Sequence, residues 1–367
     1  MPPTLDLDFI TRQPQPSIGV ALEPAHNVLN SMVLLNAVEK LSGLGEWVYR
    51  TAARLSAAEM HRNRLVFEGL YHAVQPVRSW PSFSAYLDDL AASDGAVLRD
   101  RLLWQISAHS HRAADLAGAE PATSIAPAAL LESVDTYLGF LRQHFESIDE
   151  AIEIETHALL NDPPAMKALA LAHISALWKA HAAQEWERVK PMLQESVGAF
   201  QRIDISRLSA AEAMRAITGQ EPNEKWERLL ASARQIVFVP SAHLGPYLHK
   251  FAEGNQLWLL FGARLPEGIQ AGPSALSRSD LLVRLGALTD DTRLRILALL
   301  SQHDELCAQD IMTQLDLTQS AASRHLRQLS ATGYITERRR EIAKCYTLNR
   351  ERIQDTFQAL DRFLVQP

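Results

Sequence analysis

The chain has 367 residues, enough for two or three domains with a large core. Its content of 47% hydrophobic and 22% charged residues is that of a globular protein and excludes a disordered one. The first thirty residues lack a basic start followed by an apolar run, so we expect no secretory signal. No run of about eighteen apolar residues occurs, so we expect no membrane partner.

The front of the chain is predicted to be mainly helical after a short strand at residues 17–22. Residues 24–41 show helical spacing of apolar side chains. Ser56 with Glu59, and later Ser209 with Glu212, form capping-box patterns that mark helix starts. Further helical segments are expected at residues 82–92, 94–116, 128–145, 148–160 and 164–200, the last of them broken or kinked near Pro191.

Two compact apolar runs, residues 235–239 and 256–262, change this pattern. They are of strand type and flank the irregular segment SAHLGPYLHKFAEGN. We therefore expect a small sheet that closes the front domain, with residues 17–22 as a third strand. The segment 265–277 holds Pro266, Gly268, Gly272 and Pro273 and is the predicted linker. It divides the chain into a front domain, residues 1–264, and a tail domain, residues 278–367.

The tail shows a helix-turn-helix pattern. Helices are predicted at residues 279–288, 292–300 and 308–315, and a turn at Asp316 joins the third to a helix at 318–332. In that helix Ala322, Leu326 and Leu329 form one apolar stripe, which should face a core. Thr318 is suited to cap its start, and Gly333 follows its last turn.

The opposite surface of the 318–332 helix carries short hydrogen-bonding groups followed by guanidinium groups. Such groups read base edges and bind phosphates in DNA. We therefore predict that this helix enters a DNA groove through six side chains, Gln319, Ser320, Ser323, Arg324, His325 and Arg327.

Two short runs, residues 334–338 and 344–348, predict a β-hairpin wing. Its basic residues, Arg338, Arg339, Arg340 and Lys344, should lie against the DNA backbone or the minor groove. The net charge of −7 is unfavourable for DNA binding by the chain as a whole. Residues 318–344, however, hold six basic residues against two acidic ones, so the positive charge is local to helix and wing.

The segments ALTDDTRLRILALL, ELCAQDIMTQLDLTQSAASRHLRQL and GYITERRREIAKCYTL together resemble the ArsR family of bacterial transcription regulators. The resemblance covers roughly the last quarter of the chain. It implies a symmetric homodimer whose helices enter neighbouring major grooves of a pseudo-palindromic, double-stranded DNA operator. We expect the helix at 279–288 and a stripe of the last helix to form the dimer seam; this stripe comprises Ile353, Phe357, Leu360 and Leu364.

The fold expected for the whole chain is mainly α, with a large helical front domain that includes a small β-sheet and a winged helix-turn-helix tail. The function expected is sequence-specific regulation of transcription, as a repressor, in the cytoplasm. The segment VFVPSAHLGPYL and the strand-then-helix opening resemble long N-terminal regions attached to ArsR-like modules in some actinobacterial regulators. This second resemblance implies a sensing or assembly domain, so a small-molecule effector is among the expected partners.

Metal sensing is not expected, although ArsR-family regulators often sense metals. In metal-sensing members the segment ELCAQDI would carry two cysteines, whereas here Cys307 is followed two residues on by Gln309. Cys345 is predicted to lie in the wing strand rather than beside Cys307, and one thiolate does not make a site. The last helix contains no histidine. We predict no metal and no cofactor, and we interpret both cysteines as small, partly buried thiols in a reducing compartment.

Two other functions stay open at this point. The winged module could bind another protein instead of DNA, as an interaction domain without sequence specificity. The front domain could be an enzyme, but the sequence contains no glycine-rich phosphate loop, no nucleophile elbow and no paired-histidine zinc motif. We therefore expect no enzymatic activity.

Overall fold

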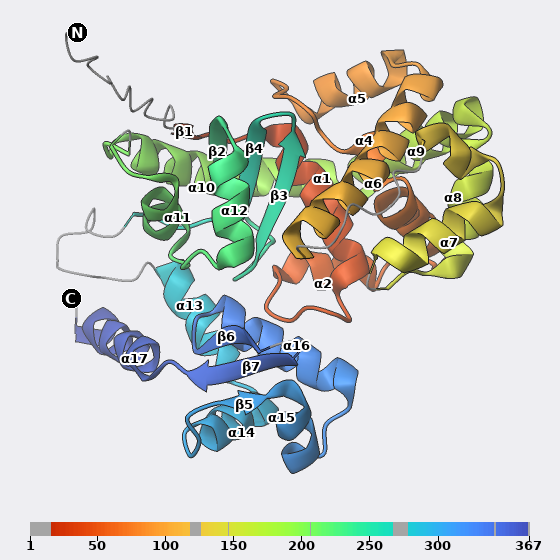
Figure 1. Cartoon of the computed structure of the whole chain (residues 1–367). Coiled ribbons are helices and arrows are strands. Elements are labelled where there is room, and N and C mark those ends of the chain that lie inside the picture. Colours follow the sequence, from red (N-terminus) through yellow and green to blue (C-terminus); the bar gives the residue numbers. More distant parts are fainter. Residues whose placement is uncertain are drawn as a thin grey trace, which may run out of the picture.

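The computed structural model describes residues 16–117, 126–145, 147–205, 207–266, 278–340 and 343–365. Within these ranges helices dominate and two small sheets occur, so the mainly α fold class is confirmed (Figure 1). The described part of the chain contains no helix that is long and apolar enough to span a membrane. The predicted linker lies almost wholly outside the described residues.

The front domain contains a four-stranded sheet in the order β1-β2-β4-β3, with β1 at Ser17–Val20, β2 at Gln235–Ser241, β3 at Leu248–Glu253 and β4 at Gln256–Gly262. Strands β1, β2 and β4 are parallel, whereas β3 pairs with β4 in the antiparallel sense. The three predicted strands are present. Strand β3 was not predicted because it lies at the edge of the sheet, where half-buried polar residues such as Lys250 interrupt the apolar pattern.

Both faces of this sheet are buried, which explains why its central strands are continuously apolar. Along β2, Ile236 and Phe238 face a smaller core, whereas Val237 and Val239 face the larger one. The smaller core is closed by residues of α10, α11 and α12, which span Ala183–Gln201, Ala210–Thr218 and Glu224–Ser232.

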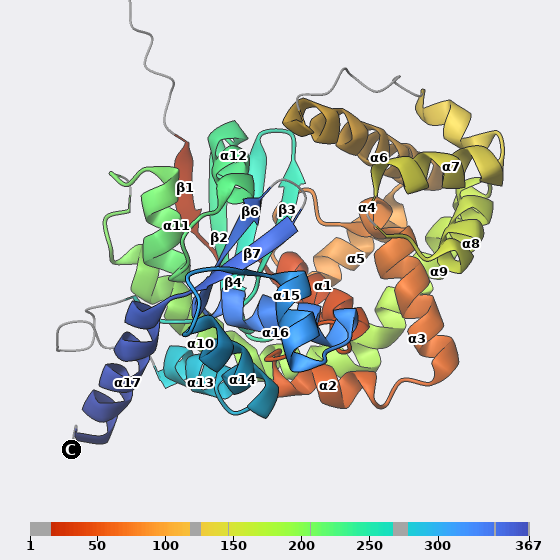
Figure 2. The same ribbon diagram turned by 60° about the horizontal axis from the view of Figure 1, so that its bottom comes forward.

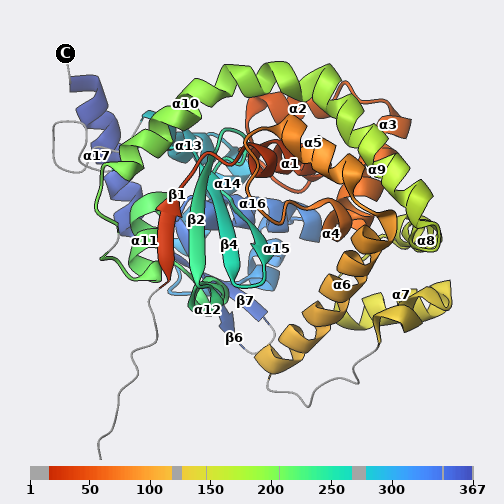
Figure 3. The ribbon, with the colours of Figure 1, turned by 90° about the horizontal axis from the view of Figure 1, so that it is seen from above.

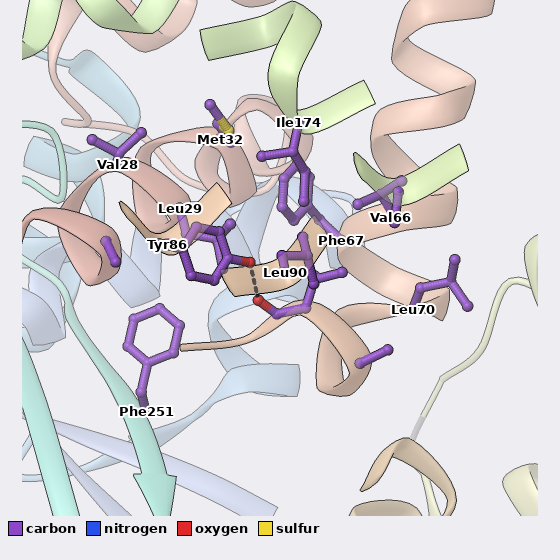
Figure 4. Close-up of a cluster of buried hydrophobic side chains, with 14 of the residues drawn as sticks. Val28, Leu29, Met32, Val66, Phe67, Leu70, Tyr86, Leu90, Ile174 and Phe251 are labelled. Atoms are coloured by element: carbon purple, nitrogen blue, oxygen red, sulfur yellow. Dashed lines mark hydrogen bonds between the residues drawn. The ribbon is translucent and has the colours of Figure 1, made fainter. Parts of the chain in front are cut away.

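The larger core joins the sheet to the helical body of the front domain. Figure 4 shows its centre, where side chains of α1, α5, α9 and β3 pack together and the Tyr86 hydroxyl donates to the Val74 carbonyl. The helices of this body are α1 (Pro24–Leu34), α2 (Glu46–Ala52), α3 (Ala57–Arg64), α4 (Tyr71–Val74), α5 (Phe83–Ala92), α6 (Gly95–Ala117), α7 (Val134–His144), α8 (Glu150–Leu160) and α9 (Pro163–Leu177).

Helices α9 and α10 form one long arc around the sheet (Figure 3). The helix is not broken at Pro191, because α10 continues through that residue, and the alternative of a kink there stays a prediction. A π-helical turn at Trp178–Ala182 joins the two helices instead. Both predicted capping boxes are confirmed, with the backbone nitrogens of Ser56 and Ser209 donating to Glu59 and Glu212 at 2.9 and 2.8 Å.

The tail is a winged helix-turn-helix domain. Its elements are α13 (Arg278–Ala287), α14 (Asp291–Leu300), β5 (Leu306–Cys307), α15 (Ala308–Leu315), α16 (Gln319–Ala331), β6 (Ile335–Arg340), β7 (Ala343–Leu348) and α17 (Arg350–Val365). The sheet has the order β5-β7-β6 and is antiparallel throughout. The predicted stripe of α16 is buried as expected, because Ala322, Leu326 and Leu329 are nearly inaccessible.

The two cysteines form a disulfide, which corrects the prediction that Cys345 does not lie beside Cys307 and that both are thiols. Strand β5 pairs with β7 in a register that places Cys307 directly opposite Cys345. Strand β5 is only two residues long, so its sequence shows no strand pattern. The pairing of two cysteines 38 positions apart could therefore not be predicted. The disulfide links the start of α15 to the wing.

The loop between α1 and α2 is held against the carboxyl end of β2. The Gly45 nitrogen donates to the His243 carbonyl at 2.9 Å, and the Tyr247 hydroxyl donates to the Ser42 carbonyl at 2.7 Å. Gly245 has a φ of 62°, and a Cβ added there would lie 2.0 Å from the Gly43 carbonyl oxygen. Glycine is therefore required at 245 both for its conformation and for this close approach.

We predict that Gly245→Ala destabilises the protein more than Gly254→Ala. Both glycines have a positive φ, but a Cβ at Gly254 meets nothing within 4 Å. Gly254→Ala should cost about 1 kcal/mol from backbone strain alone. Gly245→Ala should cost at least about 2 kcal/mol more, because a backbone carbonyl must move. Urea unfolding of the two variants measures the difference, and equal losses would contradict the packing described here.

Candidate nucleic-acid interface

Helix α16 starts at a turn that fixes its direction. Asp316, with a φ of 53°, ends α15 in the left-handed conformation that aspartate tolerates better than most residues. Thr318 then caps α16, because its hydroxyl accepts from the Ala321 nitrogen at 3.3 Å. The structure therefore confirms the predicted turn at Asp316 and the predicted cap at Thr318.

Five of the six predicted groove residues lie on the side of α16 that is turned away from the tail core. Gln319, Ser320 and Arg327 are exposed, and Ser323 and Arg324 are half-buried. The first turn thus offers amide and hydroxyl groups, and the next turns offer two guanidinium groups. This combination can form hydrogen bonds with base edges and ion pairs with phosphates.

The sixth predicted residue, His325, is placed differently, because only 5% of it is exposed. Its Nδ1 lies 3.6 Å from Oδ1 of Asp290, the capping residue of α14. Burial lowers the pKa of His325, against the opposing effect of the Asp290 carboxylate. In this position His325 links α16 to the start of α14 and does not reach the exposed face.

The wing, formed by β6 and β7, follows α16 in the sequence and carries the predicted basic residues. Arg338, Arg340 and Lys344 are exposed, whereas the side chain of Arg339 lies outside the described residues and only its backbone pairing with Lys344 is seen. Arg340 pairs with Glu305 at 3.7 Å and Lys344 with Glu337 at 3.0 Å. The Lys344–Glu337 pair is exposed on both sides, and such a pair contributes roughly 0–1 kcal/mol, so a phosphate can replace Glu337 at little cost.

Nothing in the described ranges groups three or more His, Cys, Asp or Glu side chains as a metal ion would require. Cys307, the one family-like metal position, is bonded to Cys345. A disulfide sulfur is not a thiolate and is not a metal ligand of the usual kind.

A residue that the sequence did not single out, Gln328, connects α16 to the front domain. Gln328 is only 3% exposed, although it lies outside the apolar stripe. The Ser42 hydroxyl donates to Gln328 Oε1 at 2.5 Å, and a Cβ at Gly43 would lie 2.9 Å from Gln328 Nε2. Gln328 could not be predicted as a contact between the domains, because a polar residue on a polar helix face looks the same in the sequence whether it is exposed or covered.

One further hydrogen bond joins the tail to the front domain, and it comes from a side chain that also bonds within the tail. Arg352 of α17 donates through Nη2 to the Gly219 carbonyl at 3.0 Å and through Nε to the Thr332 carbonyl at 3.3 Å. Figures 1 and 2 show α16 in the layer of the tail next to the front domain, with α14 and α15 on the outer side.

Comparison with known proteins covers this tail region. The family model described as bacterial regulatory protein, arsR family, matches residues 290–337. The arsenical resistance operon repressor of Escherichia coli (strain K12) is 46% identical over 52 residues, which are 14% of this chain and 44% of the relative. The arsenic resistance transcriptional regulator ArsR1 of Pseudomonas putida (strain KT2440) is 39% identical over 64 residues, 17% of this chain and 50% of the relative.

A third relative extends the similarity over more of its own length. The arsenic resistance transcriptional regulator ArsR2 of Pseudomonas putida (strain KT2440) is 35% identical over 85 residues, 21% of this chain and 74% of the relative. The chain thus spans about half the length of the first two relatives and about three quarters of the third. Through its tail domain, the chain belongs to the ArsR family of bacterial regulatory proteins.

Proposed function

We propose that this protein is a cytoplasmic, homodimeric repressor of transcription that binds a specific DNA operator through its tail and is controlled by its front domain. The observation that carries the proposal is the exposed amide, hydroxyl and guanidinium face of α16 beside a basic wing. The relatives are named as transcriptional regulators and, in one case, as a repressor. We also propose that the front domain acts by binding and not by catalysis, since the sequence contains no glycine-rich phosphate loop, nucleophile elbow or paired-histidine zinc motif.

In this proposal α16 enters the major groove with its first turns leading. Gln319, Ser320, Ser323 and Arg324 face base edges, and Arg327 contacts base or phosphate. Arg338, Arg339, Arg340 and Lys344 bind phosphates or the minor groove. His325 contributes by holding α16 on α14, since its ring is buried beside Asp290.

Replacing Arg324 by Ala should weaken operator binding by about 1–3 kcal/mol, because a guanidinium contact to a base edge or a phosphate is lost. Titrations of the operator and of a scrambled duplex at several salt concentrations distinguish the two contacts. Loss on the operator alone indicates a base contact. Equal loss on both duplexes, with a salt slope reduced by about one unit, indicates a phosphate contact.

The matched control is Arg295→Ala, which removes an exposed guanidinium from α14 on the outer side of the tail. It should leave both titrations unchanged. An Arg324→Ala variant that binds both duplexes like the unmodified chain would contradict the proposed role of α16.

The homodimer is proposed from an apolar surface on α17. Phe357 is 53% exposed and Leu364 is 72% exposed, and both belong to the predicted dimer stripe. Leu282 of α13, the helix packed against α17, is also exposed. A second copy of the same surface would remove these side chains from water in a two-fold symmetric contact.

We predict that Phe357→Glu shifts the protein from dimer to monomer and with it lowers operator affinity. A carboxylate at this position must be desolvated in the seam, which should weaken dimerisation by about 2 kcal/mol or more. Light scattering after size exclusion measures the mass. The control Gln358→Glu places the same charge on the neighbouring exposed position and should stay dimeric; a monomeric unmodified chain would refute the seam.

Control by the front domain is proposed from its contact with α16. The loop that carries Ser42 and Gly43 covers Gln328, which follows Arg324 by one turn. A major groove closes around a helix on both sides, so the duplex backbone needs the space beside α16. We call the arrangement in which this loop covers Gln328 the closed arrangement. In it the front domain occupies the space beside α16 that the duplex would need, so the front domain and DNA compete for α16.

Removing the Ser42 hydroxyl should loosen this closed arrangement and strengthen operator binding. One hydrogen bond contributes about 1 kcal/mol, so Ser42→Ala should raise the affinity by up to about fivefold. Ser232→Ala is the control, since that hydroxyl bonds only within its own helix, to Leu229. Fluorescence anisotropy with a labelled operator measures both variants, and unchanged or weaker binding by Ser42→Ala would refute competition between front domain and DNA.

A further inference from the structure

A cavity of the front domain lies between α3 and the end of α9. Its empty volume is about 650 Å³, part of which is open to solvent. The lining comes from Glu59 and Arg62 of α3, from residues of α9 between Leu169 and Leu177, and from Ala180 and His181 of the π-helical turn that follows. Turns of this kind are frequent at functional sites, and the volume has room for a small organic molecule.

The wall that α9 contributes is largely apolar and made of small side chains. Ala172, Ala176 and Ala180 line it at intervals of four residues, beside Leu169 and Leu177. Residues four apart lie on nearly the same face of a helix, so the alanines form a strip along the cavity. Longer side chains would fill this space. The strip suits a flat apolar body such as an aromatic ring.

His173 is the buried polar group of this wall, with 6% of it exposed. Its Nε2 lies 3.0 Å from Oδ1 of Asn63. The Asn63 Nδ2 donates to the Met32 carbonyl at 3.2 Å, and because a carbonyl oxygen can only accept, this bond fixes the orientation of the amide. Oδ1 of Asn63 is therefore the acceptor that faces His173, and Nε2 of His173 must carry the proton.

The other ring nitrogen of His173, Nδ1, is consequently a hydrogen-bond acceptor. Burial, together with the nearby Arg62, lowers the pKa of His173 to about 4, so the ring is neutral at neutral pH and Nδ1 has no proton. Among the described residues none donates a hydrogen bond to Nδ1. A shielded acceptor without a partner costs free energy, so a ligand that donates an O–H or N–H group to it would be stabilised.

The charged groups at the cavity oppose each other. Arg62 and Glu59 both lie close enough to His173 to act on it, and they do so in opposite directions. A ligand with a net charge would be repelled by one of these two side chains. The pair therefore favours an uncharged ligand over a charged one.

The cavity is connected by contacts to the loop that covers Gln328. Helix α10 continues from the π-helical turn, and Oε1 of its Glu185 lies 3.3 Å from Nε2 of His243, both of them buried. The His243 carbonyl accepts from the Gly45 nitrogen, in the loop that also carries Ser42. A displacement of the π-helical turn can therefore reach α16 through packed and hydrogen-bonded groups.

We propose that this cavity binds an uncharged aromatic molecule with an N–H or O–H donor, such as an indole or a phenol, and that the donor bonds to Nδ1 of His173. In the function proposed above, this molecule is the effector of the front domain. That second part rests on the proposed function, whereas the binding site does not.

Isothermal titration calorimetry of the full chain with indole, phenol and benzofuran tests the site. Benzofuran has nearly the shape of indole, but an oxygen replaces its N–H donor. Indole should bind at one site per chain and at least about fivefold more tightly than benzofuran, because only indole donates to Nδ1. Absence of binding by both indole and phenol would overturn the site, and equal affinities for indole and benzofuran would overturn the role of His173.

Two variants locate the bound molecule. Ala176→Phe fills the cavity from an exposed position and should weaken indole binding at least about tenfold. His173→Leu removes the acceptor and should reduce the preference for indole over benzofuran to none. The control Ala158→Phe adds the same ring to an exposed position of α8 outside the lining and should bind indole like the unmodified chain.

Unchanged indole binding by Ala176→Phe would mean that indole binds elsewhere, which overturns the site. Circular dichroism shows whether His173→Leu is folded, because the substitution leaves Oδ1 of Asn63 without its donor. If His173→Leu is unfolded, the comparison of indole with benzofuran on the unmodified chain decides the role of Nδ1.

The effector role is tested by operator titration with and without saturating indole. Indole should change the operator affinity at least about fivefold in the unmodified chain and in Ala158→Phe, but not in Ala176→Phe. Unchanged affinity in the unmodified chain would overturn the effector role and leave the site. Calorimetry involves no DNA, so a chain that binds indole but no duplex refutes the proposed function alone.

Discussion

The contact of Gln328 with Ser42 is the constraint on which the arrangement of the two domains depends. It places a polar helix, whose outer groups are suited to DNA, partly inside an intramolecular interface. A hydrogen bond between neutral groups contributes only about 1 kcal/mol, so this contact by itself holds the two domains together weakly. It is also specific, because a glycine must stand at 43 for the amide to approach, and Tyr247 must hold the loop in place. In the proposed function, a weak and specific contact would let the front domain release α16 for DNA binding.

Much of the tail was predictable because its signals are local. The spacing of Ala322, Leu326 and Leu329 identifies one buried face of α16, and Thr318 identifies its start. The capping boxes at Ser56 and Ser209 are local in the same sense, since each involves residues three apart. Helical periodicity and side-chain-to-backbone hydrogen bonds depend only on residues a few positions apart, so they can be predicted without knowledge of the tertiary structure.

What was missed depends on partners distant in the sequence. The disulfide required the register of a two-residue strand against β7, and the burial of Gln328 required a loop 286 positions away. His325 was assigned to the groove with the other polar residues of its helix, but its ring lies buried beside Asp290 at the start of α14. Strand β3 escaped prediction because edge strands share the polar composition of loops.

The tertiary structure also gives the polar residues of the tail more than one use. Arg352 lies on α17, the helix with the exposed apolar face, and its guanidinium bonds to the front domain at Gly219 and to the residue after α16 at Thr332. Arg352 therefore links α17 both to α16 and to the front domain, so a change in the position of α17 at the proposed dimer seam would act on both through one guanidinium.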